Sequence, residues 1–393
     1  MNDPIVIVSA ARTPMGAFQG ELKQFAASEL GAAAIRAAVE RAKIKPEQVD
    51  EVIMGCVLPA GQGQAPARQA SLGAGLPLAT GCTTINKMCG SGMKAAMLAH
   101  DLLAAGTNDI MVAGGMESMT NAPYLLAKAR GGYRLGHGQL IDHMFYDGLE
   151  DAYEKGRLMG SFAEDCAAKY SFTREQQDKF AVASLERAQA ANKNGSFAWE
   201  ITPMNLKAGK DERFMERDES PFKANFEKIP TLKPAFKKDG TITAANSSSI
   251  SDGGAALVMM RRSTAEKLGL APLAIVAGHS THAQEPGWFT TAPVGAIKKL
   301  YDKTGWSAGS VDLYEINEAF AVVTMAAMKE HGLAHEKVNI HGGACALGHP
   351  IGASGARLLV TLIGALRRTR GKRGIASLCI GGGEATAMAI ELA

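Results

Sequence analysis

The chain has 393 residues, of which 46% are hydrophobic and 21% charged, and its formal net charge is only +3. This is the composition of an ordinary globular protein, and the length is too great for a single core, so we expect two or three subdomains. A small net charge without a long basic run predicts neither a nucleic acid nor an anionic membrane surface as partner.

The six cysteines favour a reducing compartment. None forms a C-x-x-C pair and no Cys/His spacing is typical of a zinc site, so we expect free thiols and no bound metal. A strand that begins at Ile5 leaves no room for a signal or transit peptide, and no apolar run approaches the roughly 20 residues of a membrane span. We therefore expect a cytoplasmic protein without a membrane partner.

The first 118 residues alternate apolar strands with helices. Ser28 is the expected cap of the first helix. The periodicity predicts strands at 5–8, 49–55 and 109–115, and helices at 28–39, 66–72 and 93–103. Buried strands that alternate with helices are typical of an α/β fold with a mainly parallel sheet.

The pattern changes from about residue 119 to residue 246. Charged residues become more frequent and strand signals become sparse. Thr173, followed by Glu175 and Gln176, predicts the start of a helix that runs to Ala191. We interpret 119–246 as a long inserted segment.

The α/β pattern then returns, with strands near 251–260, 273–276 and 312–315 and a helix from Ala319. Residues 91–117 and 354–384 share one order: a glycine turn, a helix, a strand and a second glycine turn. Two such turns could coincide by chance, but the shared order favours an internal duplication. The two halves would be residues 1–118, completed by about 247–270, and residues 271–393.

Cys89 lies in the most unusual segment, Asn86-Lys87-Met88-Cys89-Gly90-Ser91-Gly92-Met93-Lys94. A strand ends here, a glycine turn follows, and a helix begins. A helix N-terminus favours a thiolate, and Gly90 and Gly92 would leave room for a substrate. A buried core cysteine is the alternative, and this segment alone does not decide between them.

Three further segments carry reactive side chains at predicted strand ends. Asn317 opens a helix, His349 lies in a glycine-rich loop, and Cys379 ends a strand. Taken singly, they could be a helix cap, a loop histidine and a core cysteine. Taken together with Cys89, they predict one site for acyl chemistry at the carboxyl ends of the strands.

These motifs resemble the thiolases, and among them the short-chain acetyl-CoA acetyltransferases. The resemblance covers essentially the whole chain and rests on six segments in the same order: 8–14, 86–92, 114–118, 317–320, 348–355 and 379–383. It implies duplicated βαβαβ halves in a layered α-β-α-β-α architecture with an inserted loop domain. It also implies an enzyme of fatty-acid metabolism that reversibly condenses two acetyl-CoA to acetoacetyl-CoA and CoA, by a ping-pong mechanism through an acyl-cysteine.

The resemblance implies a role for each reactive residue. Cys89 takes the acyl group, His349 activates Cys89 and helps bind the thioester oxygen, and Cys379 moves a proton. Asn317 positions a water for one oxyanion hole, and the N–H groups of Cys89 and Gly381 form the other. The chemistry itself asks for such groups, because a thiolate is both a nucleophile and a leaving group and because one oxyanion donor contributes roughly 3 kcal/mol.

Acyl-CoA and CoA are the implied partners, and no cofactor is needed beyond the CoA thioester that serves as substrate. The family's CoA positions correspond to Leu149, Met159, Lys223, Ala235, Phe236, Ala244, Ser248, Ala319 and Phe320. The implied acyl pocket contains Met116, Phe289 and Thr290. Phe289 is typical of thiolases that accept an α-methyl branch, which makes 2-methylacetoacetyl-CoA a candidate second substrate. Family members are commonly tetramers joined partly through a loop that corresponds to 122–139, so we expect a homotetramer.

The sequence departs from the family pattern near the CoA site. Leu158 stands where an imidazole is usual, and His341 stands where Asn is common. A cation is usual near Pro221, and we expect Lys223 or another basic residue to bind the CoA phosphates instead.

Three other interpretations fit less well. A ketoacyl synthase would replace the second cysteine, Cys379. An inactive acyl-CoA or lipid binder on the same fold would be expected to lose Cys89, His349 or Cys379, and all three are present. A nicotinamide dehydrogenase would carry G-x-G-x-x-G after its first strand, and this chain does not.

Overall fold

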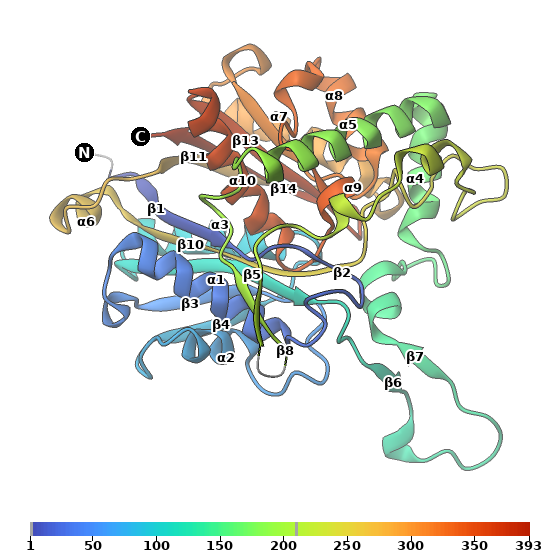
Figure 1. Cartoon of the computed structure of the whole chain (residues 1–393), viewed down its shortest axis with the longest axis horizontal. Coiled ribbons are helices and arrows are strands. Elements are labelled where there is room, and N and C mark those ends of the chain that lie inside the picture. The colour runs from blue at the N-terminus through green and yellow to red at the C-terminus, as the bar shows by residue number, and fades with distance from the viewer. Residues whose placement is uncertain (1–2, 209–210) are drawn as a thin grey trace.

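The computed structural model describes residues 3–208 and 211–393, and its centre is a ten-stranded sheet (Figure 1). The N-terminal half contributes, in spatial order, β1 (Ile5–Arg12), β10 (Ser251–Arg261), β5 (Ile110–Ser118), β3 (Glu51–Gly55) and β4 (Gly81–Ile85). The C-terminal half contributes β11 (Ala274–Ala283), β14 (Glu384–Leu392), β13 (Arg373–Ile380) and β12 (Leu313–Ile316). Short β2 (Gly16–Ala17) pairs with β10. The halves meet where β1 pairs with β11.

The two halves repeat one topology. In each, the first strand pairs antiparallel with the second, the second antiparallel with the third, and the third parallel with the fourth. The fourth strand has a further parallel partner in each half. In the N-terminal half β3 pairs with β4, and in the C-terminal half β12 forms a single bridge between Tyr314 and Val338. Both first strands carry a register shift, between Ile7 and Ser9 and between Val276 and Gly278. The predicted duplication is therefore confirmed.

The prediction of a mainly parallel sheet is wrong, because β10 and β14 run antiparallel to both of their neighbours. Strand β14 follows β13 after only Gly381–Gly383, and so short a connection can only return the chain in the opposite direction. Gly382 and Gly383 take φ values of 94° and 88°, which L side chains avoid.

Helices cover the outer face of each half of the sheet, and two further helices fill the space between the two halves. Helices α1 (Ala27–Ala42) and α2 (Pro66–Gly73) pack on the N-terminal half, and α7 (Ala292–Thr304) and α8 (Ala321–His331) on the C-terminal half. Helices α3 (Ser91–Ala104) and α10 (Ser354–Thr369) lie between the halves. Along β1, Val6 and Val8 face α1 whereas Ile5 and Ile7 face the central helices. This gives the α-β-α-β-α layering, with the two halves below and above in Figure 1.

The helix starts test the predicted caps. The predicted start of α5 (Arg174–Lys193) is confirmed, and it forms a capping box. Thr173 Oγ1 accepts a hydrogen bond from Gln176 N at 3.2 Å, and Gln176 Oε1 accepts one from Thr173 N at 3.0 Å. Ser28 is not the cap of α1; the cap is Ala26, whose N–H donates to the Glu29 carboxylate at 2.8 Å. A carboxylate in the first turn can satisfy the free N–H groups without a capping hydroxyl.

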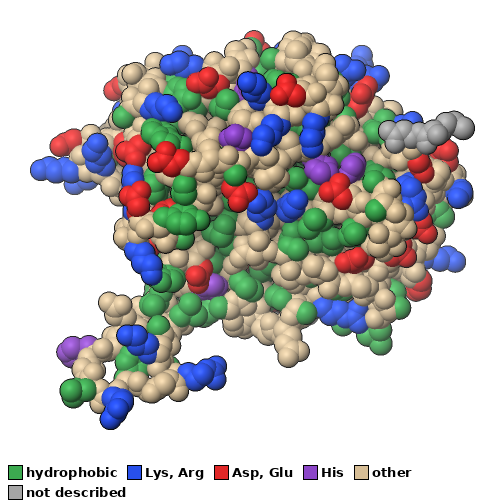
Figure 2. Space-filling view, turned by 180° about the vertical axis from the view of Figure 1, so that it is seen from behind, with side chains coloured by type: hydrophobic (Ala, Val, Ile, Leu, Met, Phe, Trp, Pro, Cys, Tyr) green, Lys and Arg blue, Asp and Glu red, His purple; other side chains and the backbone are tan. Residues whose placement is uncertain are grey.

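The segment between β5 and β10 contains two small hairpins as well as helices. Its elements are β6 (Tyr124–Leu126), β7 (Leu140–Asp142), α4 (Met159–Tyr170), α5, β8 (Met204–Ala208) and β9 (Asp211–Met215). The β6–β7 hairpin stands clear of the body (Figures 1 and 2). The predicted boundaries of the segments 1–118, 119–246 and 271–393 stay predictions. The other α-helices among the described residues are α6 (Arg262–Lys267) and α9 (Ala344–Leu347). Within the described residues, no helix combines the length and apolarity needed to cross a bilayer.

Candidate active site

A cavity of about 330 Å³ opens where the carboxyl ends of the strands meet the inserted segment. Cys89, His349, Cys379 and Gly381 line it together, although they are far apart in the sequence. Its other walls come from Met88, Tyr146, Asp147, Gly148, Leu149, Glu150, Asp151, Ala152, Tyr153, Met159, Ser248, Phe289, Ala319, Phe320, Ile351 and Gly382.

Cys89 lies in a tight turn between β4 and α3. Met88 takes a φ of 47°, in the left-handed region, and its N–H donates to Asn86 Oδ1 at 2.8 Å. The Ser91 hydroxyl donates to the Met88 carbonyl at 2.6 Å and accepts from Lys87 N at 2.9 Å. These bonds hold a backbone conformation that costs about 1–3 kcal/mol by itself.

The two glycines beside Cys89 serve packing rather than substrate access, which corrects the prediction. A Cβ on Gly90 would collide with the Ile380 side chain of β13. A Cβ on Gly92 would lie 2.8 Å from the Ala356 nitrogen and 2.9 Å from the Gly352 carbonyl oxygen. Neither glycine lines the cavity. They let the Cys89 turn approach the C-terminal half, whose residues complete the site.

Cys89 is a thiol at rest rather than the predicted thiolate. Burial raises its pKa to about 11, although the backbone N–H groups of Gly381 and of Cys89 itself favour the charged form. Since most of the thiol stays protonated at neutral pH, attack on a thioester needs a nearby base.

His349 lines the same cavity, and its hydrogen bonds leave one ring nitrogen free to accept a proton. Its Nδ1 lies 2.6 Å from the Ser354 hydroxyl, which itself donates to the Pro350 carbonyl at 2.9 Å. Ser354 must therefore accept from Nδ1–H, which leaves the lone pair on Nε2. The Asn317 amide nitrogen lies 3.4 Å from Nε2. Burial, assisted by the Arg357 charge, lowers the pKa of His349 to about 3, so the imidazole is neutral.

Cys379 is the second-to-last residue of β13 and is almost fully buried. Burial and the charge of a Cys89 thiolate hold the pKa of Cys379 well above its usual value. A thiol with so high a pKa gives a strong base once it is deprotonated, as a proton carrier for a weakly acidic carbon needs.

Two buried carboxylates that the sequence interpretation left without a role position the loops of the site. Glu117 accepts from the N–H groups of Val57 and Gly352, both at 2.9 Å, and so ties the loop after His349 to the N-terminal half. Glu318 accepts from Ser184, Asn339 and Cys345 at 2.6–3.1 Å. Their sequence signal was weak: each is a single carboxylate at or just after the end of a strand, with no motif of its own.

Comparison with known proteins agrees with this geometry. The model of the thiolase N-terminal domain matches residues 5–263, and that of the thiolase C-terminal domain matches residues 270–392. The chain belongs to the thiolase family.

Relatives of this thiolase match it end to end. It is 52% identical to "Acetyl-CoA acetyltransferase 2" of Arabidopsis thaliana, over 99% of this chain and 97% of the relative. It is 48% identical to "Acetyl-CoA acetyltransferase" of Chromobacterium violaceum, over 98% and 99% of the two chains. The acetyl-CoA acetyltransferase of Bacillus anthracis superimposes with a TM-score of 0.97 at 41% identity, over all of both chains. The Acat5 thiolase of Ascaris suum, solved in complex with coenzyme A, superimposes with a TM-score of 0.94 at 41% identity, over 99% of this chain and 100% of the other.

Only some of the residues predicted to bind CoA line the cavity. Its lining contains Leu149, Met159, Ser248, Ala319 and Phe320. Phe236 lies behind it, packed edge-on against the Phe320 ring at 6.0 Å. Ala235 and Ala244 do not line the cavity. The CoA role of these residues stays a prediction.

Lys223 does not reach this cavity. Its ammonium pairs with Glu219 and lines a separate surface hollow with Arg213 and Arg217. The contact between Lys223 and the CoA phosphates stays a prediction.

Of the predicted acyl pocket, only Phe289 lines the cavity. Thr290 is fully buried beside Cys166. The placement of Met116 is wrong: it is buried against α1, on the far side of the sheet from Cys89. Side chains alternate along a strand, and Ile110 and Val112 of β5 face α1 just as Met116 does.

Proposed function

We propose that this thiolase is an acetyl-CoA C-acetyltransferase, which condenses two acetyl-CoA to acetoacetyl-CoA and CoA and also catalyses the reverse thiolysis. The observation that carries the proposal is the enclosure of Cys89, His349 and Cys379 in one cavity, with the imidazole neutral. Relatives that bear this activity in their names match the whole chain.

The first half-reaction transfers an acetyl group to Cys89. His349 Nε2 takes the thiol proton while the sulfur attacks the thioester carbonyl carbon. The C–S bond to CoA breaks, and the departing CoA thiolate takes the proton of Cys379. The N–H groups of Cys89 and Gly381, which face the Cys89 sulfur, then face the carbonyl oxygen of the acyl group bound to it. The products are acetyl-Cys89, free CoA, protonated His349 and the Cys379 thiolate.

The second half-reaction forms the carbon–carbon bond. The Cys379 thiolate takes an α-proton from a second acetyl-CoA, and the enolate attacks the acetyl carbonyl on Cys89. The Cys89 thiolate leaves and takes back the proton from His349. All three groups return to their starting states, so the cycle needs no cofactor beyond the CoA thioesters.

A coupled assay with acetoacetyl-CoA and CoA, which follows loss of the 3-ketoacyl chromophore, tests the proposal. We expect Cys89→Ser to lower kcat/KM at least about a thousandfold, because no acyl-enzyme forms. Cys379→Ser should lose most condensation but still become acetylated, and peptide mass mapping after acetyl-CoA should find the acetyl group on Cys89. Cys82→Ser, outside the cavity, is the matched control. Acetyl trapped on Cys379 alone would overturn the division of labour.

We extend the proposal to 2-methylacetoacetyl-CoA, since Phe289 lines the cavity with its ring edge against Phe162 at 5.9 Å. A flat ring leaves lateral space that a flexible Met would fill. We expect Phe289→Met to lower kcat/KM for the 2-methyl substrate about 10–200-fold more than for acetoacetyl-CoA. A wild-type preference for acetoacetyl-CoA beyond about a thousandfold would exclude the branched substrate, since one methyl group cannot supply it.

We also propose a homotetramer that works in the reducing cytoplasm, held together in part by the β6–β7 hairpin. Leu126, Leu135 and Leu140 on this hairpin are 53%, 99% and 66% exposed, which is costly unless another chain covers them. Analytical ultracentrifugation should find Leu126→Asp/Leu135→Asp smaller than the wild type, with Leu268→Asp as control. Equal masses would contradict the assignment. Cell fractionation tests the compartment.

A further inference from the structure

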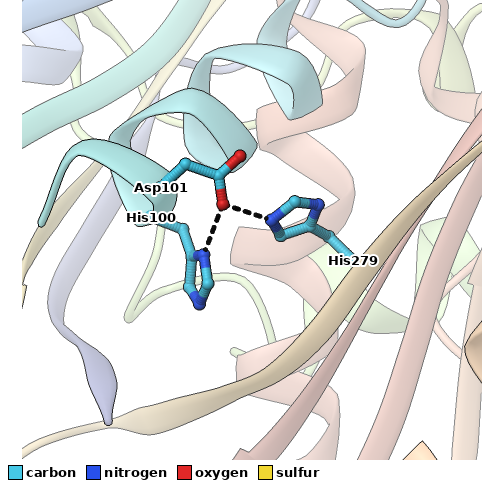
Figure 3. A group of neighbouring side chains, drawn as sticks. All are labelled: His100, Asp101 and His279. Atoms are coloured by element: carbon cyan, nitrogen blue, oxygen red, sulfur yellow. Dashed lines mark hydrogen bonds and ion pairs between the residues drawn. The ribbon is translucent and has the colours of Figure 1, made fainter. Parts of the chain in front are cut away.

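A second cluster of titratable groups lies away from the active site, at the far end of α3. His100 and Asp101 are neighbours on α3, and His279 lies on β11 of the other half (Figure 3). Asp101 Oδ1 is 3.0 Å from His100 Nδ1 and 2.8 Å from His279 Nε2. The imidazole rings meet edge to face with centroids 4.9 Å apart. Three groups from two distant parts of the chain thus point their polar atoms at one spot.

The donor set and its spacing suit a transition metal. One ligand atom from each residue lies within 4.8 Å of the other two. The ligand atoms of a tetrahedral zinc site lie roughly 3.3 Å apart, given bonds of 2.0–2.1 Å. The two distances from Asp101 Oδ1 to the histidine nitrogens, 3.0 and 2.8 Å, come close to that spacing, and the two histidines must approach each other to complete it. Two imidazoles and one carboxylate are ligands that Zn²⁺ and its neighbours in the first row accept.

Solvent can reach the cluster. The side chains of His100, Asp101 and His279 are 22%, 53% and 16% exposed, which leaves access for an ion and a water as fourth ligand. One feature opposes binding: Lys303 on α7 donates to the His279 carbonyl at 2.9 Å.

We propose that His100, Asp101 and His279 bind a divalent first-row transition metal ion such as Zn²⁺, as a clamp between α3 and β11. His100 lies nine residues into α3, roughly 14 Å along the helix from the turn that carries Cys89, so the ion does not touch the reacting atoms. Its effect is on stability, because it joins the central helix of one half to the first strand of the other.

Metal titration of thiol-blocked, chelator-treated enzyme tests the clamp, because blocked cysteines cannot supply sulfur ligands. Calorimetry with ZnCl₂ should find one site per chain. His279→Asn and Asp101→Asn should each weaken binding at least a hundredfold, since even the loss of an outer-shell partner costs 10–100-fold. His282→Asn, on the same strand but outside the cluster, should bind as the wild type does. Lys303→Met should tighten binding.

Two further readouts separate the clamp from a merely hydrogen-bonded surface cluster. Zn²⁺ at a hundred times its Kd should raise the wild-type Tm by about 3 °C and leave that of His279→Asn unchanged. Co²⁺ should give the absorption of a four-coordinate site with nitrogen and oxygen ligands. Equal Zn²⁺ affinity in wild type and His279→Asn, or no binding below millimolar concentration, would overturn the proposal. Thiolase turnover plays no part in this test.

Discussion

His341 is a buried imidazole whose Nδ1 has no hydrogen-bond partner among the described residues. Its ring packs edge-on against Phe197, with centroids 5.7 Å apart, and it is only 7% exposed. Burial and the Arg368 charge lower the pKa of His341 to about 4 from the usual 6.5. A neutral imidazole held in this way makes folding depend on pH.

Protonation of His341 should destabilise the protein in mild acid. Between pH 6.5 and 4 the unfolded chain binds a proton that the folded chain excludes, so stability is lost as pH falls through this window. The loss at pH 5 relative to pH 8 is about 2 kcal/mol for this one group. His349, whose pKa is lowered to about 3, adds to the slope in the same direction.

Urea unfolding of the wild type and of His341→Asn at pH 8 and pH 5 measures this contribution. The variant should lose about 2 kcal/mol less than the wild type on acidification. His137→Asn, on the exposed hairpin loop, is the control. Parallel losses in wild type and His341→Asn would show that the buried imidazole does not titrate as described.

Helices α3 and α10 pack closely at their N-terminal ends, where each helix contributes a glycine, Gly92 and Gly355, to the contact. A Cβ on Gly355 would collide with the backbone nitrogen of Met93, and Gly92 faces the Ala356 nitrogen in the same way. The first helix follows Cys89, and the second begins with Ser354, which orients His349. One contact between two elements therefore sets the relative position of nucleophile and base.

Gly355→Ala should weaken both the fold and the chemistry. Overpacking here should lower the free energy of unfolding by about 1–3 kcal/mol, because backbone rather than a flexible side chain must move. A shift of about 1 Å between Cys89 and His349 should lower kcat more than tenfold. Chemical denaturation and the thiolysis assay measure the two effects. Gly309→Ala, where the new methyl would meet no atom closer than 3.9 Å, is the control, and equal behaviour of the two variants would contradict the argument.

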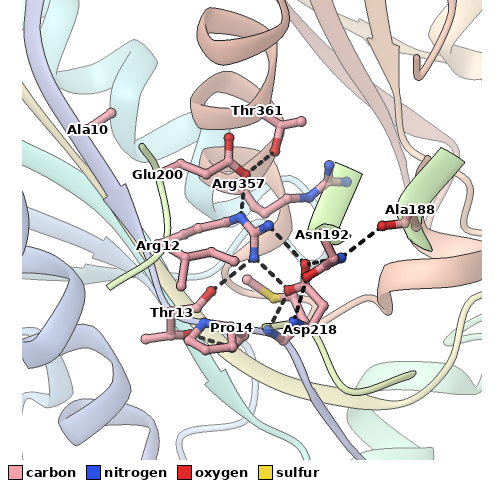
Figure 4. Close-up of polar contacts among 12 residues, drawn as sticks. Ala10, Arg12, Thr13, Pro14, Ala188, Asn192, Glu200, Asp218, Arg357 and Thr361 are labelled. Carbon is pink, nitrogen blue, oxygen red and sulfur yellow. Dashed lines mark hydrogen bonds and ion pairs between the residues drawn. The ribbon is translucent and has the colours of Figure 1, made fainter. Parts of the chain in front are cut away.

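At the scale of the whole molecule, a buried ionic network joins the first strand to the inserted segment and to α10 (Figure 4). Arg12 donates to Glu200 at 2.5 Å and to Asp218 at 2.6 and 3.0 Å, and all three side chains are fully buried. Glu200 also accepts from Thr361 of α10 at 3.1 Å. Burial would lower the pKa of Arg12, but the two carboxylates raise it.

Removing one partner should cost far more than the network itself contributes. Arg12→Met leaves two buried carboxylates without their cation, and we expect a loss of about 3–5 kcal/mol in the free energy of unfolding. The triple variant Arg12→Met/Glu200→Gln/Asp218→Asn should recover part of that loss, since no unpaired charge remains. Denaturant titration measures both, with Lys372→Met of an exposed ion pair as the control, expected within about 1 kcal/mol of wild type. Equal stability of the single and triple variants would contradict this account.

Local signals in the sequence predicted individual elements well. The capping box at Thr173, the helix from Pro66 and the strand that carries Cys379 near its end rest on neighbouring residues, and the structure has all three. The repeated order of turn, helix and strand predicted the duplication. The same local reasoning failed for Ser28, because a carboxylate at Glu29 could do the work of the expected cap.

Other features depend on which distant segments meet, and a single sequence does not show this. The glycines beside Cys89 were predicted to admit substrate, but their neighbours are Ile380 and Ala356, more than 260 positions away. Met116 was placed at the site by motif alone, whereas the alternation of β5 turns it toward α1. His279 stands 178 positions from Asp101, so no spacing rule could have found that cluster.

The sequence by itself determined the types of reactive group and the strand ends that carry them, because nucleophile, base and glycine turns are encoded by adjacent residues. Only the tertiary structure decided how those groups behave. The turn at Cys89 provides a helix N-terminus that favours a thiolate, yet burial between the two halves raises the pKa of the thiol to about 11 and lowers that of His349 to about 3. Desolvation depends on everything packed around a group, and that packing exists only once the halves have closed on each other.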